Sequence, residues 1–167
     1  ALIGAAVMAM TVMMAGQERD RAKIADTYKW NLADIYPGDA AWRAQKEKIT
    51  AELPSIRTFQ GKLGSSAQAL AEALELTSRL DKELSRLYVY ASMLSDQDTR
   101  LSEPQGMQQE MQQIYASFGA QASYMEPEIL KVGSASDETF IAAEPRLTPY
   151  AFYLRDIVRR APHTLTD

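Results

Sequence analysis

The sequence predicts an all-α protein, an antiparallel helical bundle built on two long helices at about residues 66–94 and 103–125, with shorter flanking helices. Apolar residues recur every three or four positions in both ranges, which is the period of a helix buried along one stripe. Helix start and stop signals separate the ranges, and no stretch alternates as a strand would. Because the connection between the long helices is short, we expect them to pack antiparallel.

A shorter helix is expected before the long pair. Asp39 can cap its start, because a carboxylate accepts hydrogen bonds from the free N–H groups of a first helical turn. Pro54 supplies the stop, since proline cannot continue the hydrogen-bond ladder. The apolar residues of this helix are Trp42, Ile49 and Leu53.

The first long helix follows a loop marked by Gly61 and Gly64, and Ser65 with Gln68 has the spacing of a capping box. Its core stripe consists of Leu70, Ala73, Leu74, Thr77, Leu80, Leu84, Leu87, Tyr88, Ala91 and Leu94. Tyr90 falls off this stripe, so it is either exposed or faces something absent from this chain. Exposed aromatic residues favour interfaces, which makes Tyr90 a candidate interdomain contact.

The second long helix has a capping pair in Ser102 and Gln105, and Pro127 ends it. Its stripe consists of Met107, Met111, Ile114, Tyr115, Phe118, Ala122 and Met125. Methionine at helical spacing indicates core packing more than a binding face. A short helix over residues 137–143 and another from Thr148, with Pro149 at its first position, complete the bundle.

Composition excludes several classes of function. The 167 residues suffice for one domain, and the net charge of -4 offers no basic face for nucleic acid. Arg155, Arg159 and Arg160 form a short cluster that Asp156 interrupts, as in a solvated helix end. The chain has no cysteine, so disulfides, thiolate metal sites and cysteine nucleophiles are excluded.

The first residues predict export. Residues 1–16 are the predicted secretory signal: residues 1–15 are apolar apart from Thr11 and would span roughly 22 Å as a helix, which fits the apolar region of such a signal. An uncleaved membrane anchor and a helix packed on the domain are the alternatives. A charged connector, residues 17–29, follows. We therefore expect a bacterial periplasmic or extracellular protein, and a cytoplasmic one if the segment is not a signal.

No catalytic, cofactor-binding or metal-binding residue is predicted in this chain. His163 is the only histidine, and its place after Pro162 favours a turn over a zinc site, which commonly needs two histidines. Asp96, Asp98 and Glu103 lack the spacing of a calcium loop and are expected at helix ends.

Four segments, in the same order along the chain, resemble the oligoendopeptidase F family of zinc metallopeptidases, of the thimet-oligopeptidase-like clan. They are LSRLYVYASMLSDQDTR at 84–100, WNLADIYPGDAAW at 30–42, FQGKLGSSAQALAEALEL at 59–76 and EPRLTPYAFYLRDIVRRAPHTLTD at 144–167. The resemblance implies that residues 30–167 are an N-terminal helical cap domain, truncated before the catalytic domain. Such a cap would restrict access so that oligopeptides enter and folded proteins do not.

The resemblance transfers no catalytic residue. The family needs a His-Glu-x-x-His helix, and nothing in this sequence matches it. We expect zinc only in the full-length parent, with oligopeptide substrates and the catalytic domain as partners, and a chain that is inactive alone. The alternative is a stand-alone exported helical module that binds a peptide or a protein partner without catalysis.

Overall fold

The computed structural model describes Asp20 and residues 23–163, and the chain divides into two compact units, Ala1–Asn31 and Leu32–Asp167. The first unit contains the short 3-10 helix η2 (Asp26–Tyr28), where Lys29 Nζ pairs with the Asp26 carboxylate at 2.9 Å. The predicted signal segment, residues 1–16, lies outside the described residues. No helix among the residues described is long and apolar enough to cross a bilayer.

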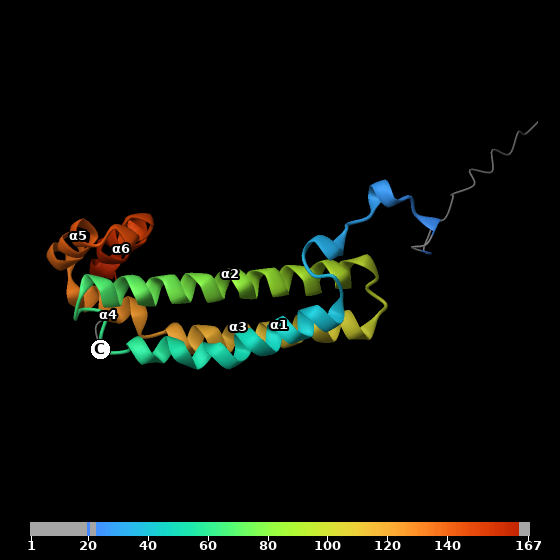
Figure 1. The fold of residues 1–167 in the computed structure, drawn as a ribbon, viewed down its shortest axis with the longest axis horizontal. Coiled ribbons are helices and arrows are strands. Elements are labelled where there is room, and N and C mark those ends of the chain that lie inside the picture. The colour runs from blue at the N-terminus through green and yellow to red at the C-terminus, as the bar shows by residue number, and fades with distance from the viewer. Residues whose placement is uncertain (1–19, 21–22, 164–167) are drawn as a thin grey trace, which may run out of the picture. The chain divides into compact units, whose positions relative to one another are not determined.

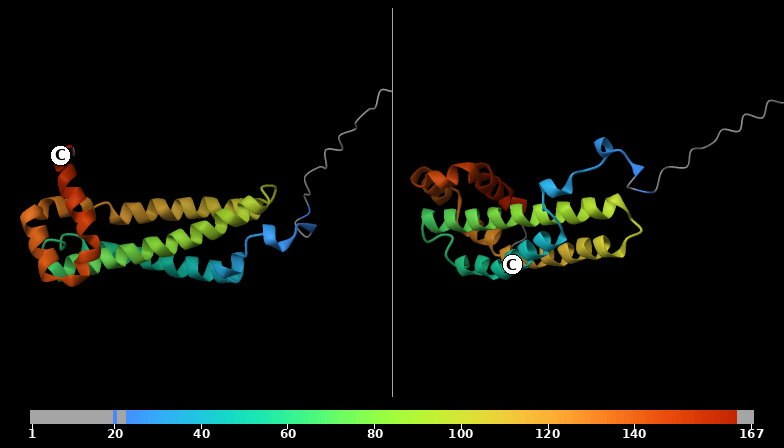
Figure 2. Two further views of the ribbon diagram at one scale, coloured as in Figure 1. Left: turned by 90° about the horizontal axis from the view of Figure 1, so that it is seen from above. Right: turned by 45° about the vertical axis from the view of Figure 1, so that its right-hand side comes forward.

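Three helices form the long part of the second unit: α1 (Asp39–Glu52), α2 (Ala67–Gln97) and α3 (Ser102–Ala122). α2 and α3 run side by side in opposite directions, and α1 lies along them (Figures 1 and 2). At about 1.5 Å per residue, the 31 residues of α2 extend over roughly 46 Å. Because every regular element in the described residues is helical, the predicted all-α class is confirmed.

Three shorter helices gather at one end of α2: α4 (Met125–Val132), α5 (Ser134–Ala143) and α6 (Ala151–Arg160). They appear in orange and red in Figures 1 and 2. Short 3-10 helices flank or connect the longer ones: η3 (Leu32–Asp34) precedes α1, η4 (Leu53–Phe59) follows it, η5 (Pro145–Tyr150) joins α5 to α6, and η6 (Ala161–His163) follows α6. The predicted helix from Thr148 therefore begins as η5 and becomes α-helical only at Ala151.

The start of α2 is capped one residue later than the sequence predicts. Ser66 is the N-cap, and its Oγ accepts the backbone N–H of Ala69 at 3.1 Å. Ser65 instead donates from Oγ to the Lys62 carbonyl at 2.6 Å. Each serine side chain could accept a hydrogen bond from the backbone N–H three residues further along, so the spacing alone does not show which serine is the N-cap. The turn that precedes the helix decides it, because that turn uses the Ser65 hydroxyl.

The expected caps of α1 and α3 are wrong in detail. Gly38 precedes α1, and Asp39 is its first residue, so the Asp39 carboxylate caps no N–H. Leu101 precedes α3 and provides no side-chain cap, while Gln105 reaches back to the Thr99 carbonyl at 2.5 Å. In each case the polar side chain is used by a tertiary contact or by the preceding turn.

The second long helix is shorter than predicted. α3 ends at Ala122, and Met125 begins α4, with Pro127 in its first turn. Proline fits there because the first N–H groups of a helix have no intrahelical partner to lose. The apolar period continues across the break, which explains why the sequence reads as one helix.

Two hydrophobic cores fill the second unit. The first core lies along α1, η4, α2 and α3, and contains Tyr36, Trp42, Ile49, Leu53, Ile56, Leu80, Leu84, Leu87, Tyr90, Ala91, Met107, Met111 and Ile114. The second core joins the start of α2 to α4, η5 and α6, and contains Leu63, Leu70, Ala71, Ala73, Leu74, Met125, Ile129, Leu147, Leu154 and Ile157. The methionines at 107, 111 and 125 are buried in these cores, as predicted.

Candidate functional site

Tyr90 lies inside the first core, which corrects its predicted position off the buried face. Its side chain is only 3% exposed, and its hydroxyl donates to Asp39 Oδ1 at 2.8 Å. The Tyr36 ring meets it edge to face, with 5.6 Å between centroids. Burial, followed by the hydrogen bond to Asp39, raises the pKa of Tyr90 to about 12. Since its hydroxyl is satisfied within this chain, the reason for expecting an interdomain contact there is gone.

The wrong prediction for Tyr90 comes from treating α2 as a helix with one buried face. A single apolar stripe describes a helix that packs on one neighbour, whereas α2 contacts both α3 and α1. The second contact buries a second face of α2, and Tyr90 lies on it. Tyr88 and Tyr115, which the sequence places on the core stripes, do meet edge to face at 6.0 Å.

The acidic residues between α2 and α3 bind neighbouring cations of the protein. The backbone N–H of Arg100 donates to Asp98 Oδ1 at 3.1 Å, and Arg43 pairs with Glu103 at 2.6 Å. The arginine side chain and backbone N–H lower the pKa of Asp98 to about 2. These carboxylates thus stabilise the ends of the helices.

The arginines near the end of α6 are also engaged with carboxylates. Arg155 pairs with Glu138 at 2.7 Å, and Arg159 pairs with Asp156 at 2.6 Å. Arg160 reaches Asp156 at 3.0 Å as well as Glu126 at 3.5 Å. Because each cation faces an acid of its own protein, the cluster does not make a basic surface.

The described residues do not fit a zinc ion. His163 is exposed at the end of η6, and no group of three His, Cys, Asp or Glu residues within the described part of the chain could hold a metal. A catalytic zinc site takes three protein ligands.

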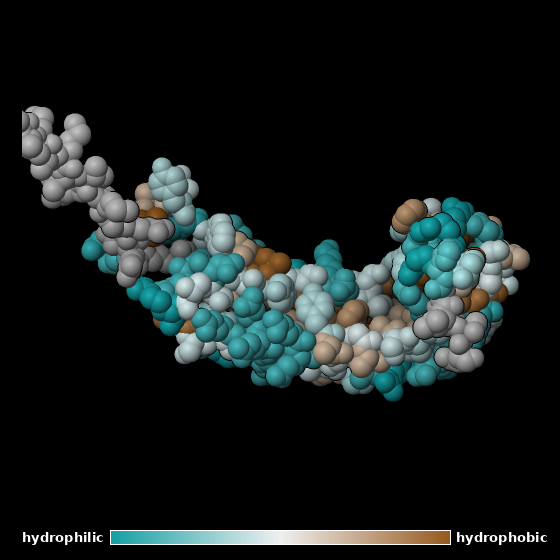
Figure 3. All heavy atoms as spheres, turned by 180° about the vertical axis from the view of Figure 1, so that it is seen from behind, coloured by the Kyte–Doolittle hydropathy of each residue, from teal (hydrophilic) through white to brown (hydrophobic). Residues whose placement is uncertain are grey.

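The second unit has a cavity of about 570 Å³ where α2 passes the junction of α3 and α4 and faces α6. We name it the α2–α4–α6 groove. It is lined by Leu74, Thr77, Ser78, Asp81, Phe118, Gly119, Ala122, Ser123, Met125, Glu126, Pro127, Tyr150 and Tyr153. Figure 3 shows the surface hollowed between the long helices and the C-terminal helices, with apolar residues gathered there.

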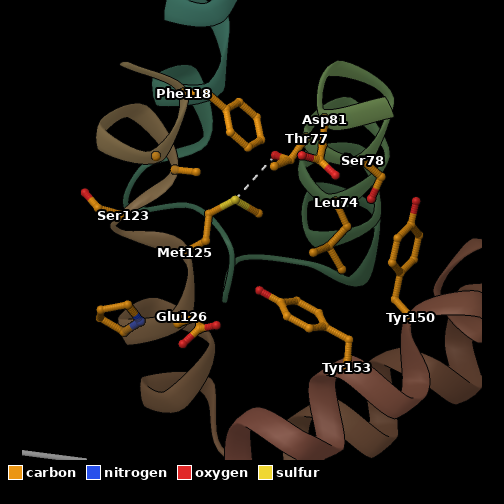
Figure 4. Close-up of a pocket in the computed structure, with 13 residues that line it drawn as sticks. Leu74, Thr77, Ser78, Asp81, Phe118, Ser123, Met125, Glu126, Tyr150 and Tyr153 are labelled. Carbon is orange, nitrogen blue, oxygen red and sulfur yellow. Dashed lines mark hydrogen bonds between the residues drawn. The ribbon is translucent and has the colours of Figure 1, made fainter. Parts of the chain in front are cut away.

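Side chains from three directions point into the groove (Figure 4). Leu74 and Met125 form its apolar base, and each is only 4% exposed. Thr77 bridges two walls, because its Oγ1 lies 3.4 Å from Met125 Sδ while it also donates to the Ala73 carbonyl at 2.8 Å. Burial, with the nearby Glu126 carboxylate adding to it, raises the pKa of Tyr153.

The sequence pattern did not single out this groove. Thr77 stands on the predicted stripe and Phe118 on the stripe of the next helix, so both read as ordinary core residues. Their partial burial arises because α3 ends at Ala122, which opens space that a continuous helix would fill. The three-residue spacing of Tyr150 and Tyr153 is the one signal that could have indicated an aromatic wall.

Asp137, on α5, is an unusual buried acid. Its side chain is 2% exposed, and neither carboxylate oxygen has a hydrogen-bond partner among the described residues. Burial, with a smaller effect of Glu138, raises the pKa of Asp137 to about 6. The carboxyl is therefore easier to protonate than an exposed aspartic acid.

Comparison with known proteins places the chain in a family. The sequence model of the family described as Oligopeptidase F matches residues 128–167. Oligopeptidase PepF of Bacillus subtilis is 33% identical over 92% of this chain, and group B oligopeptidase PepB of Streptococcus agalactiae is 31% identical over 89%. The chain belongs to the oligoendopeptidase F family.

Solved structures agree with this assignment. The oligoendopeptidase F of Enterococcus faecium shares 26% identity and superposes with a TM-score of 0.69 over 77% of this chain. A crystal structure from Chlamydophila abortus, at 24% identity, shares the fold with a TM-score of 0.75. The chain spans about a quarter of the length of the oligoendopeptidase F relatives it matches.

Proposed function

We propose that this chain is the N-terminal helical domain of an oligoendopeptidase F-like zinc metallopeptidase that hydrolyses oligopeptides. The observation that carries the proposal is 33% identity to a protein named as an oligopeptidase, over 92% of this chain. The chain corresponds to only 23% of that relative, which leaves ample length for a separate catalytic part. A unit whose described residues are all-helical in their regular elements and include no group able to hold a metal is suited to a supporting role.

In this proposal the domain is a steric cap and supplies no catalytic group. A His-Glu-x-x-His helix needs two histidines, and the chain has one. The zinc ion and its ligands would belong to the rest of the parent protein. The described helices would form a wall over the entrance, and a wall restricts access only if it is rigid. Twelve large side chains at 0–1% exposure, with Leu53 at 2% and Ile157 at 2%, provide that rigidity.

We also propose that the parent is exported. The support is the apolar character and the length of residues 1–16, followed by the charged residues 17–29. Fractionation of cells that produce the parent with a C-terminal tag checks this. We expect the tag in the periplasm or the medium, and a tag that remains in the cytoplasm would contradict export.

The decisive experiment has two steps. Reading the gene beyond Asp167 is expected to reveal a His-Glu-x-x-His motif; a stop codon at that point would overturn the proposal in favour of a stand-alone helical module. The parent is then assayed on a fluorogenic oligopeptide and on a folded protein that contains a sequence similar to that of the peptide. We expect cleavage of the peptide alone, lost on chelation and restored by zinc.

The purified 167-residue chain is the matched control. We expect it to bind no stoichiometric zinc and to cleave no reporter peptide, since its described residues include no three-ligand cluster. Zinc-dependent cleavage by this chain alone would contradict the proposal that the catalytic groups lie elsewhere in the parent.

A further inference from the structure

We propose that the α2–α4–α6 groove is a binding site for the positively charged, apolar end of an oligopeptide. The inference rests on the proposed function, because that function supplies the class of ligand. It adds a second place of contact, on the helical domain itself.

The size of the groove suits a short peptide end. Its volume of about 570 Å³ falls within the roughly 300–1,000 Å³ typical of sites for small ligands. A flat surface for a folded partner would instead be broad, with about 800 Å² buried on each side. The groove is therefore matched to a few residues of an extended chain.

The base of the groove is apolar and largely preformed. Leu74 and Met125 are almost fully buried, and Thr77 fixes the Met125 sulfur at 3.4 Å. Phe118 points toward Met125 from the end of α3 (Figure 4). An apolar side chain of a ligand would bury its surface here without a large rearrangement, which lowers the entropic cost of binding.

The charges of the groove are of one sign. Its lining includes two carboxylates, Asp81 on α2 and Glu126 on α4, and no lysine, arginine or histidine. Glu126 is in an ion pair with Arg160 at 3.5 Å, so Asp81 carries the uncompensated negative charge of the lining. Asp81 is exposed and makes no hydrogen bond or ion pair with any residue that the structure describes. This imbalance favours a cation over a neutral or acidic ligand.

The tyrosines reinforce the preference for a cation. In Figure 4 the Tyr153 side chain reaches between Leu74 and Glu126, and Tyr150 stands beside Ser78. An aromatic face attracts an ammonium or guanidinium group, and the attraction grows where water is excluded. A peptide that begins with lysine brings two positive charges, on its α-amino group and side chain, next to the apolar base.

The test uses the full 167-residue chain with two synthetic tetrapeptide amides. The probe is Lys-Phe-Leu-Ala with a free amino terminus, and its neutral counterpart is N-acetyl-Gln-Phe-Leu-Ala. Titrations followed by ¹H–¹⁵N NMR give both the affinity and the location of binding. We expect the probe to shift the amides of Ser78, Asp81 and Tyr153, and to bind about tenfold more tightly than the neutral peptide, equivalent to about 1.4 kcal/mol.

Two variants on the same helix test the charge. Asp81→Asn removes the unpaired carboxylate and is expected to weaken probe binding about threefold, as for an exposed charge pair. Asp96→Asn is the matched control: it makes the same change on α2, at an exposed position outside the groove, and should leave the affinity unchanged. Neither carboxylate is needed for the core, so both variants should fold.

Several results would overturn the inference. They are equal binding of the two peptides, no binding at millimolar probe, an affinity that Asp81→Asn does not change, or shifts that map outside the groove. A dimer in sedimentation equilibrium that the probe does not displace would assign the groove to a second copy of the chain. Zinc-dependent cleavage by the parent tests the proposed function separately, so either idea can fail while the other stands.

Discussion

The two cores of the helical unit use their polar groups differently. In the first core, aromatic residues carry long-range hydrogen bonds: the Trp42 indole donates to the Leu87 carbonyl at 2.9 Å, and the Tyr90 hydroxyl donates to Asp39. The second core is mainly aliphatic. Asp137, on α5 beside it, keeps a buried carboxylate without a partner in the described residues.

The difference indicates that the first core is built for stability, whereas the region of the second core retains features that lower it. Hydrogen bonds from buried aromatic groups fix the register of α1 against α2, since each needs one particular partner. One exception is the buried Tyr36 hydroxyl, which lacks a partner within the described part of the chain. At the other end, an unpartnered carboxylate and an open groove both cost stability, and such features concentrate at functional places.

The largest expected effect breaks the first core. Trp42→Ala should lower the free energy of unfolding by about 3–5 kcal/mol, because it removes a ring that is 0% exposed and leaves a cavity. Urea denaturation followed by circular dichroism measures this. Trp42→Phe is the matched variant, which retains a ring and loses the indole donor, and should cost less. Equal losses for the two variants would contradict the role of packing.

The next effect concerns the second core and has the opposite sign. The pKa of Asp137 is raised to about 6, so below about pH 4 its carboxyl is protonated in both the folded and the unfolded states. As the pH rises through 6, the unfolded chain is already ionised while the folded protein must bury a charge, so stability falls. Asp137→Asn should therefore stabilise the protein by roughly 1–3 kcal/mol at pH 7.5.

The same variant should have a much smaller effect at pH 4, where Asp137 is largely neutral in the folded wild-type protein and only partly ionised in the unfolded chain. Urea denaturation of both proteins at the two pH values gives the comparison. A stabilisation that is equal at pH 4 and pH 7.5 would show that ionisation of Asp137 is not its cause.

A smaller effect sharpens the role of Tyr90. Tyr90→Phe keeps the ring against Tyr36 and removes the 2.8 Å bond to Asp39, so we expect a loss of about 1 kcal/mol. Asp39→Asn in the same background should then add little, because the two groups act on one interaction. Additive losses in this double-mutant cycle would refute the coupling.

The smallest effect lies at the surface. Arg43→Gln removes the ion pair with Glu103, whose two side chains are 45% and 69% exposed. The expected loss is below about 1 kcal/mol in low salt and vanishes in 1 M salt, where exposed charges are screened. A loss that persists in high salt would indicate a packing role for the Arg43 stem.

The fold could be predicted from the sequence in most respects, because apolar period and helix stops are local signals. The all-α class, the long helix beginning near residue 66 and the burial of Met107 and Met111 follow from these signals. The pattern could not show how many neighbouring helices α2 packs against. It assigned one buried face to α2, and so it placed Tyr90 outside the core.

The groove could not be predicted from the sequence for a related reason. It exists because the chain breaks between Ala122 and Met125 while the apolar period runs on, so no local signal marks the break. Tyr153 and Asp81 are brought to one cavity from positions 72 residues apart in the sequence. The resemblance indicated the family, but only the packing of the helices could bring these side chains together.

One property follows from the length of α2. This single helix supplies buried residues to both cores, from Leu70 and Leu74 at one end to Leu87 and Ala91 at the other. Its backbone hydrogen bonds form one continuous ladder, so a fluctuation that frees either core strains the helix that the other core holds. We therefore expect the two cores to open together in one cooperative step. The amide protons along α2 should then exchange with solvent at similar rates.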